Sequence, residues 1–224
     1  MHGTLALVGG AEWTDGCEAD AELLAASGGT TVTVIPTAAA YERPDLKMAQ
    51  ARDWFGGFGA DVDVVEAYRR PHVFDEALIA KVRAARFLYL SSGTPMHLRS
   101  VLYDSPLWDA LVEAWRGGAV LAASGEAAAA LSTHMVDPRG GAFTVGLGLL
   151  SDFTVVPRAS EWSEDKWHRT LRLAPAGLDV VGIDARTALI SDPSGWRVVG
   201  PGQVSVTRGG VREEVADLPP LSAG

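Results

Sequence analysis

Short apolar runs alternate with amphipathic stretches through the first two-thirds of this 224-residue chain, and this alternation limits its possible folds more than any other feature. The apolar runs are typical of strands buried on both faces, and they cover residues 4–10, 31–37, 61–67, 86–92 and 118–124. Helical patterns lie between them, at about residues 18–27, 43–57, 74–84 and 106–116. This rhythm predicts an α/β fold with three layers, in which helices cover both faces of a doubly wound, mostly parallel sheet.

The end of the chain follows a different pattern. After residue 140, short strand-like runs are separated by turn signals at residues 193–195 and 209–210, which predicts a C-terminal antiparallel β extension of the same domain. We therefore expect a single α/β domain over residues 1–216 and a flexible tail over residues 217–224. Ligands of such sheets bind beyond the carboxyl ends of the parallel strands, which here are followed by residues 9–13, 36–41, 91–97 and 124–126.

Composition argues against several classes of protein. The net charge is −9 and Lys and Arg form no cluster, so we expect no nucleic-acid partner. The single cysteine, Cys17, cannot form an internal disulfide and has no partner at zinc-site spacing, so we expect neither a metal nor another cofactor. The N-terminus lacks the features of a signal peptide, and no apolar run approaches the ~20 residues that span a bilayer. We expect a soluble, cytoplasmic protein that does not bind membranes.

The segment GGAVLAASGEAAAAL, residues 117–131, has the pattern of a strand, a tight turn and a helix made of small residues. A serine at such a turn, here Ser124, is lifted above the sheet, where nearby backbone N–H groups stabilise charge on an attacked carbonyl. Small neighbours are required, and Ala123 and Gly125 satisfy this, whereas Glu126 stands where glycine is usual. In the alternative interpretation Ser124 only caps the helix, with Glu126 complementing the helix dipole.

Several ordered segments between residues 4 and 192 carry a family resemblance: ALVGGAE, VTVIPTAAA, FLYLSSGTPMHL, GGAVLAASGEAA, GLGLL, RTLRL and GIDARTAL. Together they resemble the serine peptidase family that contains cyanophycinase and α-aspartyl dipeptidase. The resemblance implies a flavodoxin-like, class I glutamine amidotransferase-like fold, with Ser124 at the position of the nucleophile. Glutamine amidotransferase chemistry itself is not expected, since it would need a cysteine where Ser124 stands.

The rest of the family's catalytic triad does not carry over. Where the resemblance implies the catalytic histidine, this sequence has Arg158, and where it implies the glutamate it has Ala185, preceded by Asp184. Of the family's G-G-D-Q loop, matched by residues 92–95, only Gly93 is retained. Arginine stays protonated and cannot serve as a base, so we expect a serine peptidase-like hydrolase with weak or lost activity. The alternative is a catalytically inactive relative that binds small molecules or proteins.

Another group could replace the missing base. His97 follows the fourth strand near the expected serine turn and is our candidate, although a surface or capping role on the helix beginning near Pro95 is more common for such a loop histidine. His134 lies ten residues beyond Ser124, about 15 Å along a helix, and is too far away. His168 is expected on a solvated helix face. Glu126 would be a poor base because the helix N-terminus favours its ionised form.

The crevice could also bind a ligand without reacting with it. An arginine beside a helix N-terminus favours an anion, so we expect a small acidic peptide or carboxylate as a candidate ligand, and a homodimer as a candidate assembly. Alternatively, Arg158 forms an ion pair with Glu161 or Glu164. The candidate binding residues are Glu12, Gly93, Gly125 and Arg158.

Overall fold

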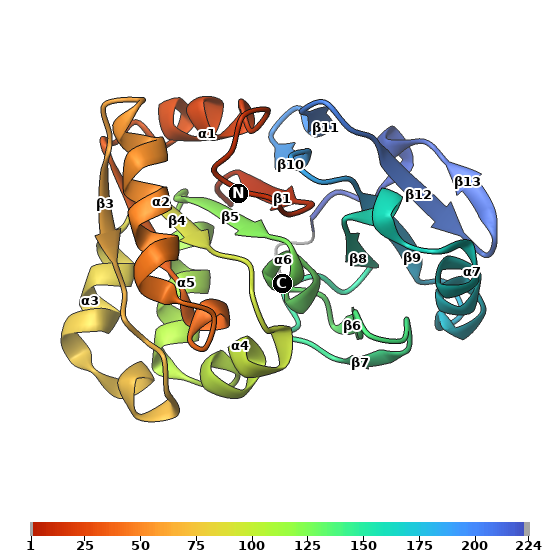
Figure 1. The fold of residues 1–224 in the computed structure, drawn as a ribbon, viewed down its shortest axis with the longest axis horizontal. Helices are drawn as coiled ribbons and strands as arrows, with labels where there is room; N and C mark the ends of the chain where they lie inside the picture. Colours follow the sequence, from red (N-terminus) through yellow and green to blue (C-terminus); the bar gives the residue numbers. More distant parts are fainter. Residues whose placement is uncertain (1, 222–224) are drawn as a thin grey trace.

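The computed structural model describes residues 2–221, and its main sheet has seven strands in the order β11-β10-β1-β5-β4-β2-β3 (Figure 1). Its five-stranded parallel part matches the five predicted runs: β1 Leu5–Val8, β2 Thr31–Ile35, β3 Asp61–Val64, β4 Phe87–Leu90 and β5 Val120–Ser124. Two antiparallel strands, β10 Ala188–Asp192 and β11 Gly195–Val199, extend the sheet beyond β1. The predicted doubly wound sheet is therefore confirmed.

Helices cover both faces of this sheet, as predicted. One face carries α1 Ala19–Ser27 and α2 Pro44–Gly56, and the other carries α3 Glu76–Ala84, α4 Pro95–Leu102, α5 Pro106–Arg116 and the short α6 Glu126–Ala130. Short 3-10 turns complete the connections, at Thr37–Ala39, Arg70–Phe74, Ala159–Glu161 and Val215–Asp217. The two helical layers enclose two separate apolar cores.

The pleat of β5 decides which core each of its side chains enters. Leu121 and Ala123 pack in the core beneath α3 to α6, whereas Val120 and Ala122 pack in the core beneath α1 and α2. Because successive strand residues point to opposite faces, Ser124 lies on the same face as Ala122. Its side chain is therefore directed under the α1–α2 layer.

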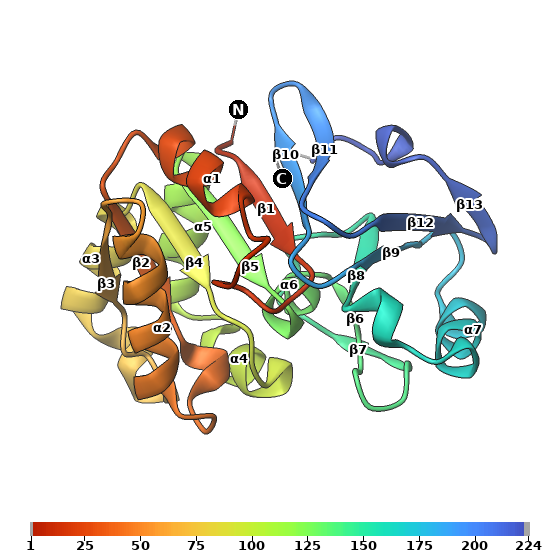
Figure 2. The ribbon, with the colours of Figure 1, turned by 45° about the horizontal axis from the view of Figure 1, so that its top comes forward.

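A second sheet lies beside the first, in the order β13-β12-β9-β8 (Figure 2). Its strands are β8 Phe153–Pro157, β9 Asp179–Ile183, β12 Val204–Arg208 and β13 Val211–Glu213, with α7 Glu164–Leu173 between β8 and β9 in sequence. A small hairpin pairs β6 His134–Val136 with β7 Phe143–Val145. The predicted antiparallel extension is confirmed for β9, β12 and β13, but β8 and β9 are parallel. A helical crossover through α7 makes this pairing possible.

The predicted boundary of the folded domain at residue 216 is too early. Leu218 is buried in the main core, and the indole Nε1 of Trp196 donates a hydrogen bond to the carbonyl oxygen of Pro219 at 2.9 Å. Residues 217–221, predicted as part of a flexible tail, therefore pack against the domain, because Leu218 offers apolar surface that the core can bury. Residues 222–224 of the predicted tail lie outside the described residues.

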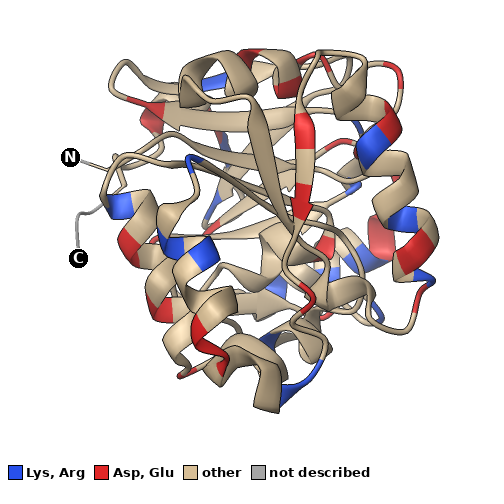
Figure 3. Ribbon diagram, turned by 90° about the vertical axis from the view of Figure 1, so that its left-hand side faces the viewer, with Lys and Arg blue, Asp and Glu red and all other residues tan. Residues whose placement is uncertain are grey.

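Opposite charges are interspersed on the side of the molecule that Figure 3 presents. Lys81 of α3 pairs with Asp63 at 2.7 Å and Arg83 of α3 pairs with Glu113 at 3.1 Å, so α3 is linked both to β3 and to α5. These pairs are partly exposed, and each contributes no more than about 1 kcal/mol to stability. None of the helices within residues 2–221 combines the length and apolar character needed to cross a membrane.

Candidate functional site

The sharp turn between β5 and α6 is centred on Gly125. Its φ of 57° and ψ of −128° are strained for a residue with a side chain, and its N–H donates to the carbonyl oxygen of Val8 at 2.8 Å. A Cβ atom added at Gly125 would lie only 2.9 Å from the Cβ of Ser92 in the loop after β4. The position at which a strand-to-helix elbow presents its nucleophile is thus occupied by a residue without a side chain.

Ser124 stands one residue before this turn and remains part of β5. It is fully buried, and its Oγ donates a hydrogen bond to Oε2 of Glu12 at 2.8 Å. The expectation that the turn lifts the Ser124 hydroxyl above the sheet is therefore not met, because the pleat directs it under α1 and α2. The alternative role as a helix cap is also not realised, since the N-cap of α6 is Gly125.

Glu12 is the centre of a buried polar network, with only 2% of its surface exposed. Its Oε1 accepts hydrogen bonds from the backbone N of Ser92 at 2.9 Å and from the Ser92 Oγ at 2.6 Å. The same oxygen lies 2.6 Å from Nζ of Lys47, which extends from α2. The network therefore links the ends of β1, β4 and β5 to α2.

The electrostatics of this network keep Glu12 ionised. Burial by itself would raise the pKa of the Glu12 carboxyl, but the Lys47 charge and the hydrogen bonds from Lys47 and Ser92 outweigh it and leave this pKa below its ordinary value. Glu12 was predicted as a residue that binds ligand at the crevice. Its buried carboxylate contacts Lys47, Ser92 and Ser124, and a role in binding ligand stays a prediction.

Two members of the network, Lys47 and Ser92, were missed by reasoning from the sequence. Lys47 also donates a hydrogen bond to the Oγ of Ser92 at 2.9 Å, and its ammonium lies 5.6 Å from the centre of the Trp13 ring. A signal did exist: Glu12 follows two glycines at the carboxyl end of a buried strand, and a buried carboxylate requires a cation or several donors.

Arg158 lies over the elbow, as the sequence suggested. It follows β8 with a φ of 49°, and its backbone N–H donates to the carbonyl oxygen of Gly9 at 2.9 Å. Its guanidinium forms a close ion pair with Glu126 and a longer contact of 3.8 Å with Glu161. The predicted alternative, pairing with Glu161, is thus present, but Glu126 is the nearer partner.

His97, our candidate for a relocated base, is directed away from Ser124. In α4 its Nε2 lies 3.0 Å from the carbonyl oxygen of Tyr68, and its ring packs edge-on against Tyr41 at 4.9 Å between centroids. The hydroxyl of Ser124 is instead bonded to Glu12. This geometry does not support His97 as the base for Ser124.

The other two histidines considered also lie away from the elbow. Helix α6 ends at Ala130, so His134 begins β6 rather than continuing a helix. His168 is exposed on α7, as predicted. Within residues 2–221, no three His, Cys, Asp or Glu side chains are grouped so that they could hold a metal ion.

A cavity of about 440 Å³, which we call the elbow cleft, opens beside Gly125. Four of its charged groups form two ion pairs, Arg158 with Glu126 and Arg139 with Asp137 at 2.8 Å. The carboxylate of Glu42 accepts a hydrogen bond from the hydroxyl of Thr94 at 2.9 Å. The predicted binding residues Gly93 and Arg158 both line it. The full lining comprises Glu42, Ser92, Gly93, Thr94, Pro95, Met96, Glu126, Asp137, Pro138, Arg139 and Arg158.

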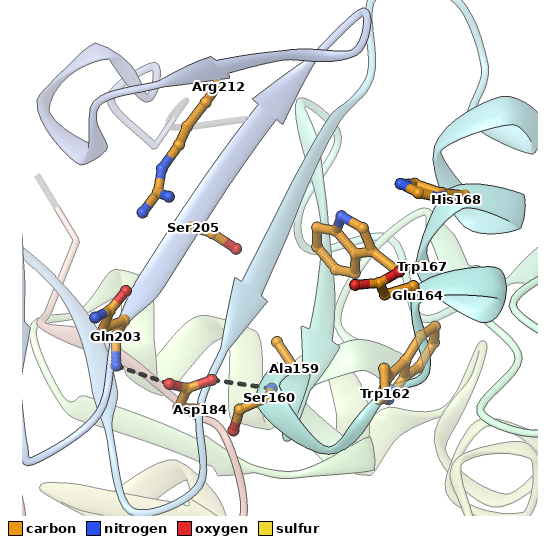
Figure 4. Close-up of a pocket in the computed structure, with 10 residues that line it drawn as sticks. All are labelled: Ala159, Ser160, Trp162, Glu164, Trp167, His168, Asp184, Gln203, Ser205 and Arg212. Atoms are coloured by element: carbon orange, nitrogen blue, oxygen red, sulfur yellow. Dashed lines mark hydrogen bonds between the residues drawn. The ribbon is translucent and has the colours of Figure 1, made fainter.

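A second cavity, also of about 440 Å³, lies between the second sheet and α7 (Figure 4). Trp162 and Trp167 line it on the α7 side and Arg212 on the β13 side. At its base the carboxylate of Asp184 accepts hydrogen bonds from the backbone N–H groups of Ser160 and Gln203, each at 3.0 Å. Asp184, adjacent to the position of the expected triad glutamate, therefore fixes two loops of the second sheet.

Comparisons with known proteins agree with this fold. A model of peptidase family S51 matches residues 5–199. The crystal structure of a peptidase from an acI-B1 Actinobacterium has a TM-score of 0.86, is 28% identical in sequence, and aligns over 95% of this chain and 93% of that one.

Curated relatives point to the same family. A cyanophycinase of Trichormus variabilis is 25% identical over 189 residues, which are 78% of this chain and 62% of the relative. A cyanophycinase of Synechococcus elongatus is 26% identical over 196 residues, which are 78% of this chain and 58% of the relative. The chain thus spans about three-fifths of the length of these cyanophycinases.

Proposed function

Since the chain belongs to peptidase family S51 and is related to serine peptidase-type hydrolases, we propose that it is a member in which Ser124-dependent peptidase activity is weak or lost. In its place, the elbow cleft binds the carboxylate of a small acidic peptide. The observation that carries this proposal is the glycine at the elbow: Gly125 occupies the strained turn, while Ser124 is buried one residue before it.

The loss of catalytic groups has a large energetic effect. A serine hydroxyl is a weak nucleophile unless a base removes its proton, and it must reach the substrate. Without the triad, only about 10³–10⁴-fold catalysis over water remains, from binding and from the backbone N–H groups. A buried Ser124, with Arg158 near the elbow in place of a histidine, is consistent with activity at or below this level.

The chemistry of the cleft supports a carboxylate ligand. The Arg158 side chain is about one-third exposed, and its planar guanidinium is suited to two-pronged contact with a carboxylate. Glu126 already provides such a carboxylate from within the chain. A ligand carboxylate therefore takes the place of the Glu126 side chain, and the volume of the cleft falls within the range of about 300–1,000 Å³ typical of small-molecule sites.

This exchange predicts opposite effects for two substitutions. Glu126→Gln removes the competing charge and is expected to tighten binding of an aspartyl dipeptide about 10-fold. Arg158→Met should weaken binding of the same dipeptide by about 10-fold or more, because a hydrogen bond to a charged group contributes about 1.5–3 kcal/mol. Isothermal titration calorimetry with Asp-Ala, and with Asn-Ala as the ligand that lacks only the side-chain carboxylate, measures both changes.

Arg139→Met is the matched control for this pair of variants. Arg139 lines the same cleft, but its guanidinium is largely exposed and paired with Asp137. Its removal changes the net charge as Arg158→Met does, yet should alter affinity less than 2-fold, since screening weakens exposed charges. Equal affinity of the wild-type protein and Arg158→Met for Asp-Ala would contradict the proposed carboxylate site.

A hydrolase that depends on Ser124 is the second candidate. The observation in its favour is the hydrogen bond from the Ser124 Oγ to a carboxylate, Glu12, that could accept its proton. We expect any hydrolysis of Asp-Ala by the wild-type protein to be unchanged in Ser124→Ala, measured as release of free alanine. A loss of this activity in folded Ser124→Ala would favour the second candidate.

A further inference from the structure

We propose that Ser92 is a reactive hydroxyl of the elbow cleft, which takes up the acyl group of an activated ester while its proton passes to Glu12. Ser92 lies in the loop after β4, is partly exposed, and lines the cleft. The proposal shares this cleft with the proposed function, but it does not require that the cleft bind a carboxylate.

The position of Ser92 is complementary to the absence of a side chain at Gly125. A Cβ atom at residue 125 would stand 2.9 Å from the Ser92 Cβ, closer than two carbon atoms can pack. Ser92 therefore fills the space that a side chain at the elbow would enter. Gly125 offers no hydroxyl at the elbow, whereas Ser92 offers one from the loop after β4 that faces it.

The hydrogen bonds of Ser92 are those of an activated serine. Its Oγ donates to Oε1 of Glu12 at 2.6 Å, within the range for proton transfer to a general base. It also accepts a hydrogen bond from Nζ of Lys47 at 2.9 Å. As the Oγ–H bond breaks, the ammonium of Lys47 stabilises the negative charge that develops on Oγ.

The reaction balances without a further reactant. The Ser92 Oγ forms a bond to the carbonyl carbon of the ester, the ester C–O bond breaks, and the alcohol leaves as an alkoxide or phenoxide. The Ser92 proton moves to Glu12, which can return it to the leaving group. Ser92 is the residue that bonds to the substrate, and Lys47 acts by positioning and stabilising charge.

The same contacts indicate the class of substrate. The lowered pKa of Glu12 makes it a weak base, so the reaction requires a reactive electrophile. An amide carbonyl is a poorer electrophile than that of an activated ester, and its nitrogen is a poor leaving group. Esters with a good leaving group are therefore favoured over peptides.

Intact-mass spectrometry of the full chain after incubation with an uncharged alkyl fluorophosphonate tests the proposal. The probe reacts by forming an O–P bond to serine while fluoride leaves. We expect one adduct per chain, mapped by fragmentation to Ser92, and its absence in Ser92→Ala. Glu12→Gln, which keeps an acceptor oxygen but is a far weaker base, should lower the labelling rate by about 10²-fold.

A neighbouring serine provides a matched control. Ser91→Ala removes a fully buried hydroxyl next to Ser92 in the chain and should keep the adduct. Locating the adduct in the wild-type protein by fragmentation tests the proposal even where a variant fails to fold. An unlabelled, folded wild-type chain, or an adduct mapped to another residue, would overturn the proposal, whereas loss of Asp-Ala binding with Ser92 still labelled would count only against the proposed carboxylate site.

Discussion

Replacement of Lys47 by methionine is expected to lower the free energy of unfolding by about 3–5 kcal/mol at pH 7. Methionine preserves much of the length and apolar contact of the lysine side chain but removes its charge. Glu12 is almost fully buried and would keep only its hydrogen bonds from Ser92 and Ser124. A buried charge that has lost its partner carries most of its desolvation penalty uncompensated.

Urea denaturation of the wild-type protein and the Lys47→Met variant measures this loss. Lys81→Met is the matched control, because Lys81 pairs with Asp63 at a similar distance of 2.7 Å but in a partly exposed place. That pair should contribute less than about 1 kcal/mol. In the double variant Lys47→Met/Glu12→Gln, neither buried charge remains, and most of the lost stability should return; an unchanged loss would contradict this account.

The pH dependence of Lys47→Met has a definite sign. In the wild-type protein the pKa of Glu12 is lowered on folding, so its contribution is present above the pKa of the unfolded state and is lost as the pH falls. Without Lys47, burial raises the pKa of Glu12 instead, and the folded state gains from protonation. The difference in stability between wild-type and variant should therefore shrink from pH 7 towards pH 4.

Asp20→Asn is expected to stabilise the protein at pH 8 by as much as about 4 kcal/mol. Asp20 lies in α1 with 2% of its surface exposed. Burial, aided by the nearby negative charge of Glu12, raises the pKa of Asp20 to about 7, although a hydrogen bond from Trp54 opposes the shift. The predicted gain follows from a shift of about three units, each equivalent to about 1.4 kcal/mol.

The direction in which stability changes with pH follows from the number of protons bound in the folded and unfolded states. Between pH 4 and 7 the folded state retains a proton on Asp20 that the unfolded state releases, so stability falls as the pH rises through this range. Asparagine carries no charge, and its oxygen can still accept the hydrogen bond from Nε1 of Trp54, which is 2.9 Å long.

Thermal or urea unfolding at pH 5 and pH 8 tests this prediction. Asp15→Asn, in the exposed loop before α1, controls for the loss of one negative charge. We expect Asp20→Asn to flatten the decline in stability between the two pH values, and Asp15→Asn to leave it within about 0.5 kcal/mol. A variant Asp20→Asn that is less stable than wild type at pH 8 would show that Asp20 is needed as a carboxylate.

The parallel sheet could be predicted because hydrophobic periodicity depends on residue type alone. Each of the five predicted apolar runs contains a parallel strand, and the helices fall between them. The parallel pairing of β8 with β9 was not predicted, because short strands separated by turn residues are equally typical of antiparallel hairpins. Strand partners are set by tertiary packing, which a local pattern does not record.

The residue at the centre of the elbow was predicted one position too early, because a sequence pattern does not fix which residue takes the strained turn. The family pattern directed attention to Ser124, yet the residue best able to adopt a positive φ in that segment is Gly125, as the structure has it. The network around Glu12 was harder to foresee, because Lys47 and Ser92 lie 35 and 80 positions further along the chain. Contacts of that separation appear only once the strands and α2 are assembled.

The Glu12 network also has a consequence for local opening of the molecule. The amide of Ser92 donates its hydrogen to the Glu12 carboxylate, so exchange of that hydrogen with solvent requires the loss of a hydrogen bond to a buried carboxylate that is also paired with Lys47. Amides protected in this way exchange through larger, cooperative openings rather than through loop fluctuations. The wall of the cleft formed by the loop after β4 is therefore ordered before any ligand arrives, and a ligand that binds there loses little affinity to the ordering of that loop.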